Sequence, residues 1–334
     1  MNIIIPMAGM GKRMRPHTLS IPKPLIPIAG KPIVQRLVED IAKVCGTPID
    51  EIAFVIGDFG EEVEQRLLAI AESVGAKGRI CYQNEPLGTA HAILCGAESL
   101  KGNVIVAYAD TLFRADFKLE TDQDAIIWVQ AVEDPSAFGV AQVNEAGEII
   151  GFVEKPQTFV SDLAIIGIYY FKDGENLRQE LQYLVDHNIK VSGEYQLTDA
   201  IENMRRKGLK FVPGQVQEWL DCGNKQATVE TNRRYLEFVR DQNLIHESVK
   251  LINSVVIPPV FVGENAVIEN TVLGPHVSVG KKTSVKDSVI RNSIVQENTV
   301  IESVNLENSM VGNFVHLTSK AADLSVGDYN SITV

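Results

Sequence analysis

The first part of the chain alternates between two spacings of apolar residues. A continuous apolar run such as 2–8 is typical of a strand buried in a parallel sheet. After it, Ile33, Leu37, Ile41 and Val44 recur at the three-to-four-residue spacing of one helix face. The expected elements here are strands at 2–8, 51–57, 79–83 and 103–109 and helices at 32–44, 61–74 and 88–99. Alternating strands and helices with short connections predict an α/β domain with a mainly parallel sheet.

The pattern then continues with four strands followed by three helices. We expect strands at 125–132, 138–143, 148–153 and 163–171 and helices near 174–187, 196–207 and 224–241. After residue 245 the helical periodicity stops, and small β-branched repeats replace it. The sequence therefore predicts two domains of different architecture, at 1–245 and 246–334.

A short repeat organises the second domain. Apolar residues first recur every six positions and then every five or six, at Phe261, Val267, Leu273, Val279, Val285, Ile290, Val295, Ile301, Leu306 and Val311. A six-residue period is typical of a parallel β-helix, in which these residues point inward and successive coils stack. An ordinary sandwich of short strands is the alternative, but it has no reason to keep a fixed step.

Composition and charge limit the classes of partner. The chain has 334 residues, of which 45% are hydrophobic and 22% charged, and this globular composition excludes a wholly disordered protein. With 31 basic against 43 acidic residues the net charge is −12, which opposes binding to nucleic acid polymers and anionic membranes. A small anionic substrate remains compatible, because a few basic side chains in a pocket outweigh a distant field.

The cysteines and the first residues indicate the compartment. Cys45, Cys81, Cys95 and Cys222 form no CxxC pair and fit no zinc or disulfide spacing, as expected of reduced thiols. The first sixteen residues lack the features of a signal peptide, and no apolar stretch is long enough for a membrane span. We therefore expect a cytoplasmic protein.

A glycine loop follows the first expected strand. Gly9 and Gly11 allow backbone N–H groups to approach a phosphate, and Arg13 and Lys23 follow in the same connection. Two cations beside exposed backbone donors suit a polyphosphate. The loop matches neither GxGxxG nor GxxxxGK[ST], so a plain tight turn is the alternative interpretation.

Further motifs follow in a fixed order from residue 9 to residue 223. They are Gly9-Met10-Gly11-Lys12-Arg13, Pro22-Lys23-Pro24-Leu25, Gln83 with Pro86-Leu87-Gly88-Thr89-Ala90, Asp110 at the end of an apolar strand, Phe138-Gly139-Val140, Val153-Glu154-Lys155-Pro156, Gly193-Glu194-Tyr195 with Leu197-Thr198-Asp199, and Trp219-Leu220-Asp221-Cys222-Gly223. Together they resemble the signatures of the sugar-1-phosphate nucleotidyltransferases of the glucose-1-phosphate thymidylyltransferase and uridylyltransferase type. The resemblance implies a Rossmann-like nucleotidyltransferase domain followed by a short left-handed parallel β-helix.

The resemblance also implies the site. The implied catalytic residues are Arg13, Lys23, Asp110 and Asp221, the last two holding Mg²⁺. The implied nucleotide-binding residues are Ala8, Gly9, Gly11, Gln83, Gly88 and Thr89, and those for the sugar phosphate are Gly139, Glu154, Lys155 and Glu194. The implied reaction transfers a nucleoside monophosphate from a nucleoside triphosphate to a sugar 1-phosphate, with glucose 1-phosphate as the default.

Single side chains refine these expectations. The carboxamide of Gln83 can accept from N3–H and donate to O4 of uracil or thymine, which favours UTP or dTTP. Thr89 is expected to cap the helix that follows it. His91 lies one turn into that helix and is expected to be an ordinary packed or exposed helix residue.

Departures from the family pattern concern the sugar more than the reaction. Lys12 stands where Thr or Ser is usual, Tyr108-Ala109-Asp110 replaces a frequent Gly-Asp-Asn, and Ile165-Ile166-Gly167 is apolar.

Two other functions stay open: a catalytically weak regulatory or scaffolding relative, and an added acyltransferase activity on the β-helix using His276 or His316. We also expect a homo-oligomer, because the open ends of a β-helix are commonly covered by a partner.

Overall fold

The computed structural model describes residues 1–9, 11–116, 118–154 and 156–320. By compactness the chain divides into two units, residues 1–26 with 31–227 and residues 27–30 with 228–334. The boundary expected at residue 245 falls inside the second unit. The domains expected at 1–245 and 246–334 stay a prediction. The structure carries no helix long and apolar enough to cross a membrane among the described residues.

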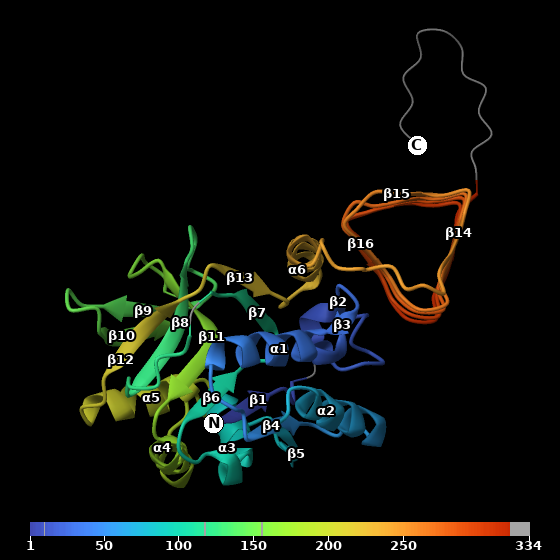
Figure 1. Ribbon diagram of the computed structural model, residues 1–334. Coiled ribbons are helices and arrows are strands. Elements are labelled where there is room, and N and C mark those ends of the chain that lie inside the picture. Colours follow the sequence, from blue (N-terminus) through green and yellow to red (C-terminus); the bar gives the residue numbers. More distant parts are fainter. Residues whose placement is uncertain (10, 117, 155, 321–334) are drawn as a thin grey trace. The chain divides into compact units, whose positions relative to one another are not determined.

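A mixed sheet forms the centre of the first unit (Figure 1). Its main path among the described residues runs β10 (Ile149–Glu154), β9 (Gly139–Val143), β11 (Leu163–Phe171), β6 (Val104–Ala107), β1 (Asn2–Pro6), β4 (Glu51–Ile56) and β5 (Lys77–Tyr82). Off this path, β8 (Ala125–Ala131) pairs with β11, and β12 (Phe211–Gln215) pairs with β8. Neighbours from β6 to β5 are parallel, whereas β11 runs antiparallel to both β6 and β8. The expected parallel arrangement therefore applies to the half of the sheet that carries the glycine loop.

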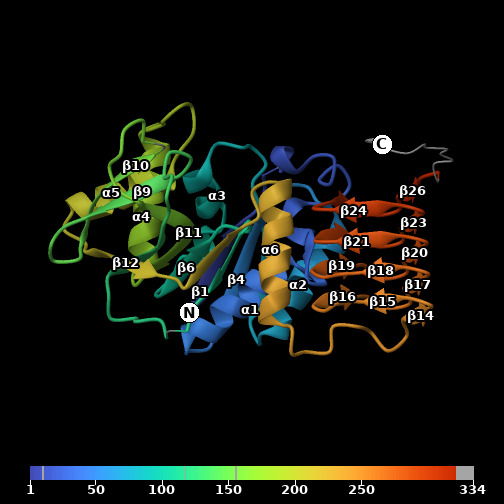
Figure 2. The same cartoon turned by 90° about the horizontal axis from the view of Figure 1, so that it is seen from above.

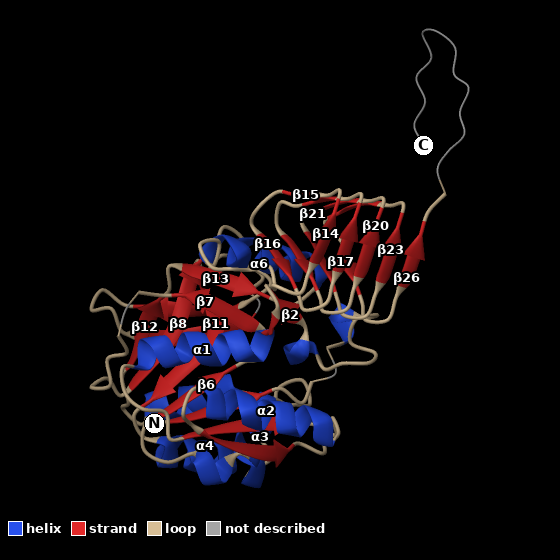
Figure 3. Ribbon diagram, turned by 45° about the vertical axis from the view of Figure 1, so that its right-hand side comes forward, coloured by secondary structure: helices blue, strands red, loops and turns tan. Residues whose placement is uncertain are grey.

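Helices cover both faces of this sheet (Figure 3). They are α1 (Ile33–Cys45), α2 (Glu61–Ser73), α3 (Thr89–Cys95), α4 (Gly174–Asp186) and α5 (Leu197–Arg206), with the short 3₁₀ helices η1 (Lys12–Met14), η2 (Lys23–Leu25) and η3 (Ala97–Ser99). The four apolar residues that predicted α1 are all buried, which confirms its periodicity. On the other face, α3, α4 and α5 pack on sheet residues such as Ile4 and Val106, which are fully buried. These apolar contacts are the dominant stabilising force of the unit.

Two short strands that the sequence did not predict carry the middle of the site. β7 (Thr111–Arg114) follows β6 directly and pairs antiparallel with β13 (Glu218–Asp221). A further pair, β2 (Pro27–Ile28) and β3 (Lys31–Pro32), precedes α1. Each of these strands has only two to four residues, too few for a spacing of two to stand out.

The second unit contains α6 (Lys225–Phe238) from Thr228 onward and three stacks of parallel strands (Figure 2). The stacks are β14 (Lys250–Ile252), β17 (Val267–Glu269), β20 (Ser284–Lys286), β23 (Val300–Glu302) and β26 (His316–Thr318); β15 (Val255–Val256), β18 (Val272–Leu273), β21 (Val289–Arg291) and β24 (Asn305–Glu307); and β16 (Val260–Val262), β19 (Val277–Val279), β22 (Ser293–Val295) and β25 (Met310–Val311). Seen end-on they enclose a triangle (Figure 1). This arrangement confirms the β-helix over the sandwich and fits the left-handed form.

The expected inward positions are correct from Leu273 onward and wrong before it. Val262 and Ile268 are fully buried, whereas Phe261 and Val267 are only partly covered. One coil takes 17 residues, as in the pairing of β14 with β17, so one of its three steps is five residues long instead of six. That shorter step lies between Ile268 and Leu273, and a constant step of six misplaces the two earlier residues by one position.

Candidate active site

The glycine loop after β1 folds back on its own connection. Gly11 has a φ of +56°, and a Cβ there would lie 3.0 Å from Cβ of Lys23, so both the backbone conformation and the close approach favour glycine. The hydroxyl of Thr18 donates to the Gly11 carbonyl at 2.9 Å and closes the loop. Gly9 has open space where a Cβ would stand, and its backbone is exposed. The predicted loop thus offers accessible backbone beside Lys23.

Lys23 joins this loop to the end of strand β6. It opens η2, is only 8% exposed, and its Nζ donates to Oδ2 of Asp110 at 2.8 Å. Arg13 lies exposed on η1. The positive charges of Lys23 and Arg13 both act on the carboxyl of Asp221. Lys23 and Asp110 are therefore in contact, and Asp221 lies within the electrostatic reach of Asp110, Lys23 and Arg13.

The strand pair β7–β13 holds the two aspartates side by side. Asp221 lies opposite Thr111 in the register, and the N–H of Cys222 donates to the Asp110 carbonyl at 2.9 Å. Burial raises the pKa of Asp221, and the charge of Asp110 adds to this, while the N–H of Gly223, Lys23 and Arg13 oppose it. The charge of Asp110 disfavours ionisation of Asp221, and a cation bound between the two carboxylates would offset this effect.

The donor set at this pair fits magnesium. Among the described residues no group of three or more His, Cys, Asp and Glu side chains could hold a metal ion. A closed protein cage is therefore missing in this part of the chain. Mg²⁺ needs no such cage, because it is commonly bound by one or two carboxylates together with water and substrate phosphates. Asp110 and Asp221 suit that mode.

An aromatic contact connects the aspartate pair to the expected sugar side. The indole N–H of Trp219 donates to Oγ1 of Thr111 at 2.8 Å. The ring of Phe138 packs edge-on against the Trp219 ring, with centroids 4.9 Å apart. Phe138 immediately precedes Gly139, the first residue of β9. This contact fixes the start of β9 relative to β13.

The residues expected to hold the sugar phosphate are only partly assembled. Gly139 lies opposite Glu154 in the β9–β10 register, and a Cβ at Gly139 would lie 2.8 Å from Oε2 of Glu154. Glu194 lies in a tight turn closed by two backbone hydrogen bonds with Val191, and its Cβ approaches Gly88. The predicted role of Lys155 falls outside the described residues.

Backbone hydrogen bonds join the Gly88–Thr89 segment to the segment that carries Glu194. A Cβ at Gly88 would lie 2.4 Å from the carbonyl oxygen of Tyr195, so only glycine fits here. The N–H of Tyr195 donates to Leu87 at 2.8 Å, and the N–H of Ala90 donates to Tyr195 at 2.9 Å. The expected nucleotide side and sugar side therefore share one backbone connection.

Thr89 caps a different helix from the one expected. It gives no side-chain cap to α3, whose N-cap residue is Gly88. Its Oγ1 instead accepts from the N–H of Leu197 at 3.0 Å, in the first turn of α5, and donates to Oε1 of Gln196. The expected local cap was wrong because a partner 108 positions away in the sequence satisfies the hydroxyl.

Gln83 is held by two acceptors. Its Nε2 lies 3.2 Å from the Gly88 carbonyl and 3.1 Å from Nδ1 of His91. The sequence pattern gave His91 no role, and its only signal was its place one turn beyond the Gly88 motif. The amide nitrogen of Gln83 is thus directed at two groups of the protein, and the expected contact of Gln83 with the base stays a prediction.

Tyr108 is a second residue that the motifs did not assign to the site. It is partly buried, and burial, together with the charges of Asp110 and Glu154, raises the pKa of its phenol, while a hydrogen bond with Thr89 opposes the shift. A Cβ at Gly167 would lie 2.8 Å from its ring, so Gly167 makes room for it. Tyr108 thus lies among groups assigned to the metal, the sugar and the nucleotide.

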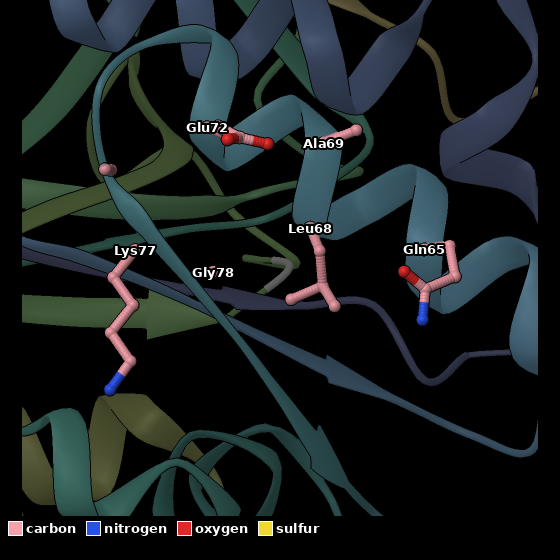
Figure 4. A pocket seen from close by; sticks show the side chains of 7 residues that line it. Gln65, Leu68, Ala69, Glu72, Lys77 and Gly78 are labelled. Carbon is pink, nitrogen blue, oxygen red and sulfur yellow. The ribbon is translucent and has the colours of Figure 1, made fainter.

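Two other places in the structure were candidates for a site, a surface hollow and a histidine on the β-helix. A surface hollow of about 380 Å³ between α2 and β5 is lined by residues such as Leu68, Glu72 and Lys77, none of them a predicted site residue (Figure 4). On the β-helix, Nε2 of His276 is paired with Oε1 of Glu237 on α6 at 2.6 Å. That pairing occupies one of the two histidines considered for acyl transfer, and the other, His316, is exposed on β26.

Comparisons with known proteins show the family of the chain. The model of the nucleotidyl transferase family matches residues 2–237. A glucose-1-phosphate thymidylyltransferase of Streptomyces antibioticus is 28% identical, over 100% of this chain and 99% of that protein. A low-salt glycan biosynthesis nucleotidyltransferase of Haloferax volcanii is 30% identical, over 93% and 92%.

Solved structures match about seven tenths of this chain. A UDP-glucose pyrophosphorylase complexed with UDP-glucose is 25% identical, with a TM-score of 0.57, and the match covers 71% of this chain and 98% of that one. The same enzyme type without ligand is 26% identical, with a TM-score of 0.58.

Proposed function

The chain belongs to the nucleotidyl transferase family, and from this premise we propose that it joins a pyrimidine nucleotide to a sugar 1-phosphate. The substrates are dTTP or UTP and, as the default sugar, glucose 1-phosphate. The products are a nucleoside diphosphate sugar and pyrophosphate. The single observation that carries this proposal is the cluster of Lys23, Asp110, Asp221 and Arg13 beside the glycine loop.

Each member of the cluster has a role in an in-line displacement at phosphorus. A sugar-phosphate oxygen attacks the α-phosphorus, and the bond to the pyrophosphate oxygen breaks. Arg13 and Lys23 bind the triphosphate and the departing pyrophosphate. The exposed backbone at Gly9 donates to phosphate oxygens together with Ala8 and Gly11. Catalysis here is positioning and charge neutralisation.

Asp110 and Asp221 would hold Mg²⁺, which when bound offsets negative charge on the phosphates. The two carboxylates leave the remaining coordination positions for water and phosphate oxygens. Lys23 donates to Asp110 in the structure, and this contact orients that carboxylate. Lys155, Glu154, Gly139 and Glu194 would contact the sugar phosphate, and Gln83, Gly88 and Thr89 the nucleoside.

The pyrimidine is supported by the relatives and not by Gln83 alone. Two similar proteins carry names that specify thymidylyl transfer or UDP-glucose. A mannose-1-phosphate guanylyltransferase subunit of Xenopus tropicalis is 29% identical over 79% of this chain, so GTP belongs among the nucleotides tested.

The test is a matrix of nucleoside triphosphates against sugar 1-phosphates with Mg²⁺, read out by pyrophosphate release. The proposal expects turnover with UTP or dTTP and a hexose 1-phosphate. Binding of a nucleotide sugar without turnover in any cell of the matrix would favour the regulatory relative instead. Turnover of an acetyl donor by the same protein would support the acyltransferase alternative, which no contact among the described residues favours.

We also propose that the protein is a cytoplasmic homo-oligomer. The first coil of the β-helix leaves Leu251, Ile252 and Val255 46%, 47% and 58% exposed beside the unpaired edges of β14 and β15. Apolar residues on an open strand edge are commonly covered by a second chain. Light scattering of the full chain, compared with Val255→Lys, measures the mass, and a monomer in both cases would contradict the oligomer.

A further inference from the structure

His91 and Gln83 form a pair next to the expected base position. Gln83 follows β5 and His91 lies in the first turns of α3, and both side chains are half-buried. Gly88, whose carbonyl touches the same amide, starts the segment joined to Tyr195. The pair therefore belongs to a rigid part of the unit and is not an isolated surface contact.

The Gly88 carbonyl determines which way the Gln83 carboxamide faces. A backbone carbonyl can only accept a hydrogen bond, so the amide nitrogen and not the oxygen must lie 3.2 Å from it. The same nitrogen lies 3.1 Å from Nδ1 of His91. Nδ1 must then be the acceptor, and the ring proton of neutral His91 lies on Nε2.

Both hydrogens of the amide are thus used within the protein. Oε1 of Gln83 has no hydrogen-bond partner among the described residues, and an oxygen accepts only. A base read by this oxygen must present an N–H on its Watson–Crick edge. Uracil and thymine do so at N3 and guanine at N1, whereas N3 of cytosine and N1 of adenine are themselves acceptors.

We propose that His91 is a positioning residue that holds the Gln83 carboxamide with its oxygen toward the base, so that the site accepts nucleotides with an imino N–H. The inference rests on the proposed function, because it assumes that Gln83 contacts the base. It adds a residue and a selection rule to that function. CTP and ATP should be rejected at this contact, and the choice between uracil or thymine and guanine must come from other groups.

Two substitutions separate the hydrogen bond from the shape of the side chain. Oδ1 of an asparagine stands the same number of bonds from the backbone as Nδ1 of histidine, so His91→Asn keeps an acceptor. His91→Leu has a branched side chain of similar reach without an acceptor, and leucine favours helix. His91→Ala is a second variant without an acceptor in case the leucine packs poorly.

The measurement is the KM and kcat for UTP and dTTP with glucose 1-phosphate and Mg²⁺. We expect His91→Leu and His91→Ala to raise the KM about fivefold, the effect of one ordinary hydrogen bond, with kcat within about twofold. His91→Asn should restore the KM to within about twofold of wild type. In a Gln83→Leu background, His91→Leu should have no further effect, because it acts through Gln83. The inhibition constant of CTP, measured in competition with UTP, should be at least about tenfold larger than the KM of UTP.

The outcomes distinguish this inference from the proposed function. An unchanged KM in His91→Leu and His91→Ala would overturn only the role of His91. The same would follow if His91→Leu raised the KM equally with and without the Gln83 side chain. Tight competition by CTP would overturn the selection rule. An active Gln83→Leu variant with an unchanged KM would overturn the base contact, and no pyrophosphate release by the wild type would overturn the proposed function itself.

Discussion

Nζ of Lys23 lies 2.8 Å from Oδ2 of Asp110, although 87 positions separate the two residues in the sequence. Lys23 is nearly enclosed, with 8% of its surface exposed, while the Asp110 side chain is 43% exposed. A buried ammonium needs a paired anion, because burial of an unpaired charge is costly. The exposed side of Asp110 is left for a cation and phosphate. This pair ties the glycine-loop connection to the end of β6.

Gly88→Ala should disrupt the site, because one added methyl group forces two backbone segments apart. The new Cβ would meet the Tyr195 carbonyl oxygen at 2.4 Å, and Gly88 has a φ of +109°. Because the 87–90 and 194–197 segments must then separate, we expect the KM for both substrates to rise at least about tenfold. Gly208→Ala is the matched control, since Gly208 has a φ of +97° but open space around it. Equal kinetic effects in the two variants would show that backbone strain, and not the clash, is responsible.

Thr89→Val should destabilise the first unit by about 1 kcal/mol, the usual cost of losing a helix cap. The substitution leaves the N–H of Leu197 without its acceptor and removes the partner of the Tyr108 phenol. Urea unfolding followed by circular dichroism measures this change. Thr89→Ser keeps the hydroxyl and should lie within about 0.5 kcal/mol of wild type. If both variants were equally stable, the cap on α5 would contribute nothing.

Glu51→Gln should reduce stability in a pH-dependent way. Burial alone would raise the pKa of Glu51, but hydrogen bonds from Arg79 and Ser99 outweigh it and lower the pKa below its ordinary value of 4.5. A carboxylate with a lowered folded-state pKa stabilises the fold above the ordinary value, and this contribution is lost as the pH falls through the folded-state pKa. Because Arg79 is partly exposed, we expect about 1 kcal/mol at pH 7. A deficit in urea unfolding that stayed constant well below pH 4.5 would contradict this.

Removal of divalent cations should abolish turnover while leaving the fold unchanged. Asp110 and Asp221 together bring two negative charges to the place where the phosphates must bind. Without a metal ion, these two carboxylates repel the triphosphate and offset the attraction of Lys23 and Arg13. Pyrophosphate release after treatment with EDTA, with Mg²⁺ restored as the control, measures the effect. Full activity in EDTA would mean that the two aspartates act without a metal ion.

Local periodicity predicted most of the elements, and the reasons are visible in particular residues. The face of α1 and the apolar residues of β1 repeat strongly enough to stand out, and both are buried as expected. The β-helix step was also visible, and the error at Phe261 and Val267 came from one coil step of five residues. Strands β7 and β13 were missed because each is stabilised by its distant partner and not by its own pattern.

The site was predicted less completely, because its details depend on contacts across the sequence. The motifs indicated Lys23, Asp110 and Asp221, which do converge. They did not indicate that Thr89 caps α5 or that His91 binds the Gln83 amide, since both contacts follow from how α3 packs beside the 194–197 segment and β5. Tyr108 stands out in the sequence only as a departure from the family pattern, and its central place follows from the fold.

The catalytic role of the Lys23–Asp110 cluster is tested by the kcat for pyrophosphate release in Lys23→Ala and Asp110→Ala, measured beside the wild type with UTP or dTTP, glucose 1-phosphate and Mg²⁺. Removing one preorganised charge from such a site typically lowers the rate on the order of 10²–10³-fold. We predict a loss of that size in each variant, with the circular dichroism spectrum unchanged. A kcat within about tenfold of wild type in either correctly folded variant would contradict the assignment of this cluster as the catalytic site.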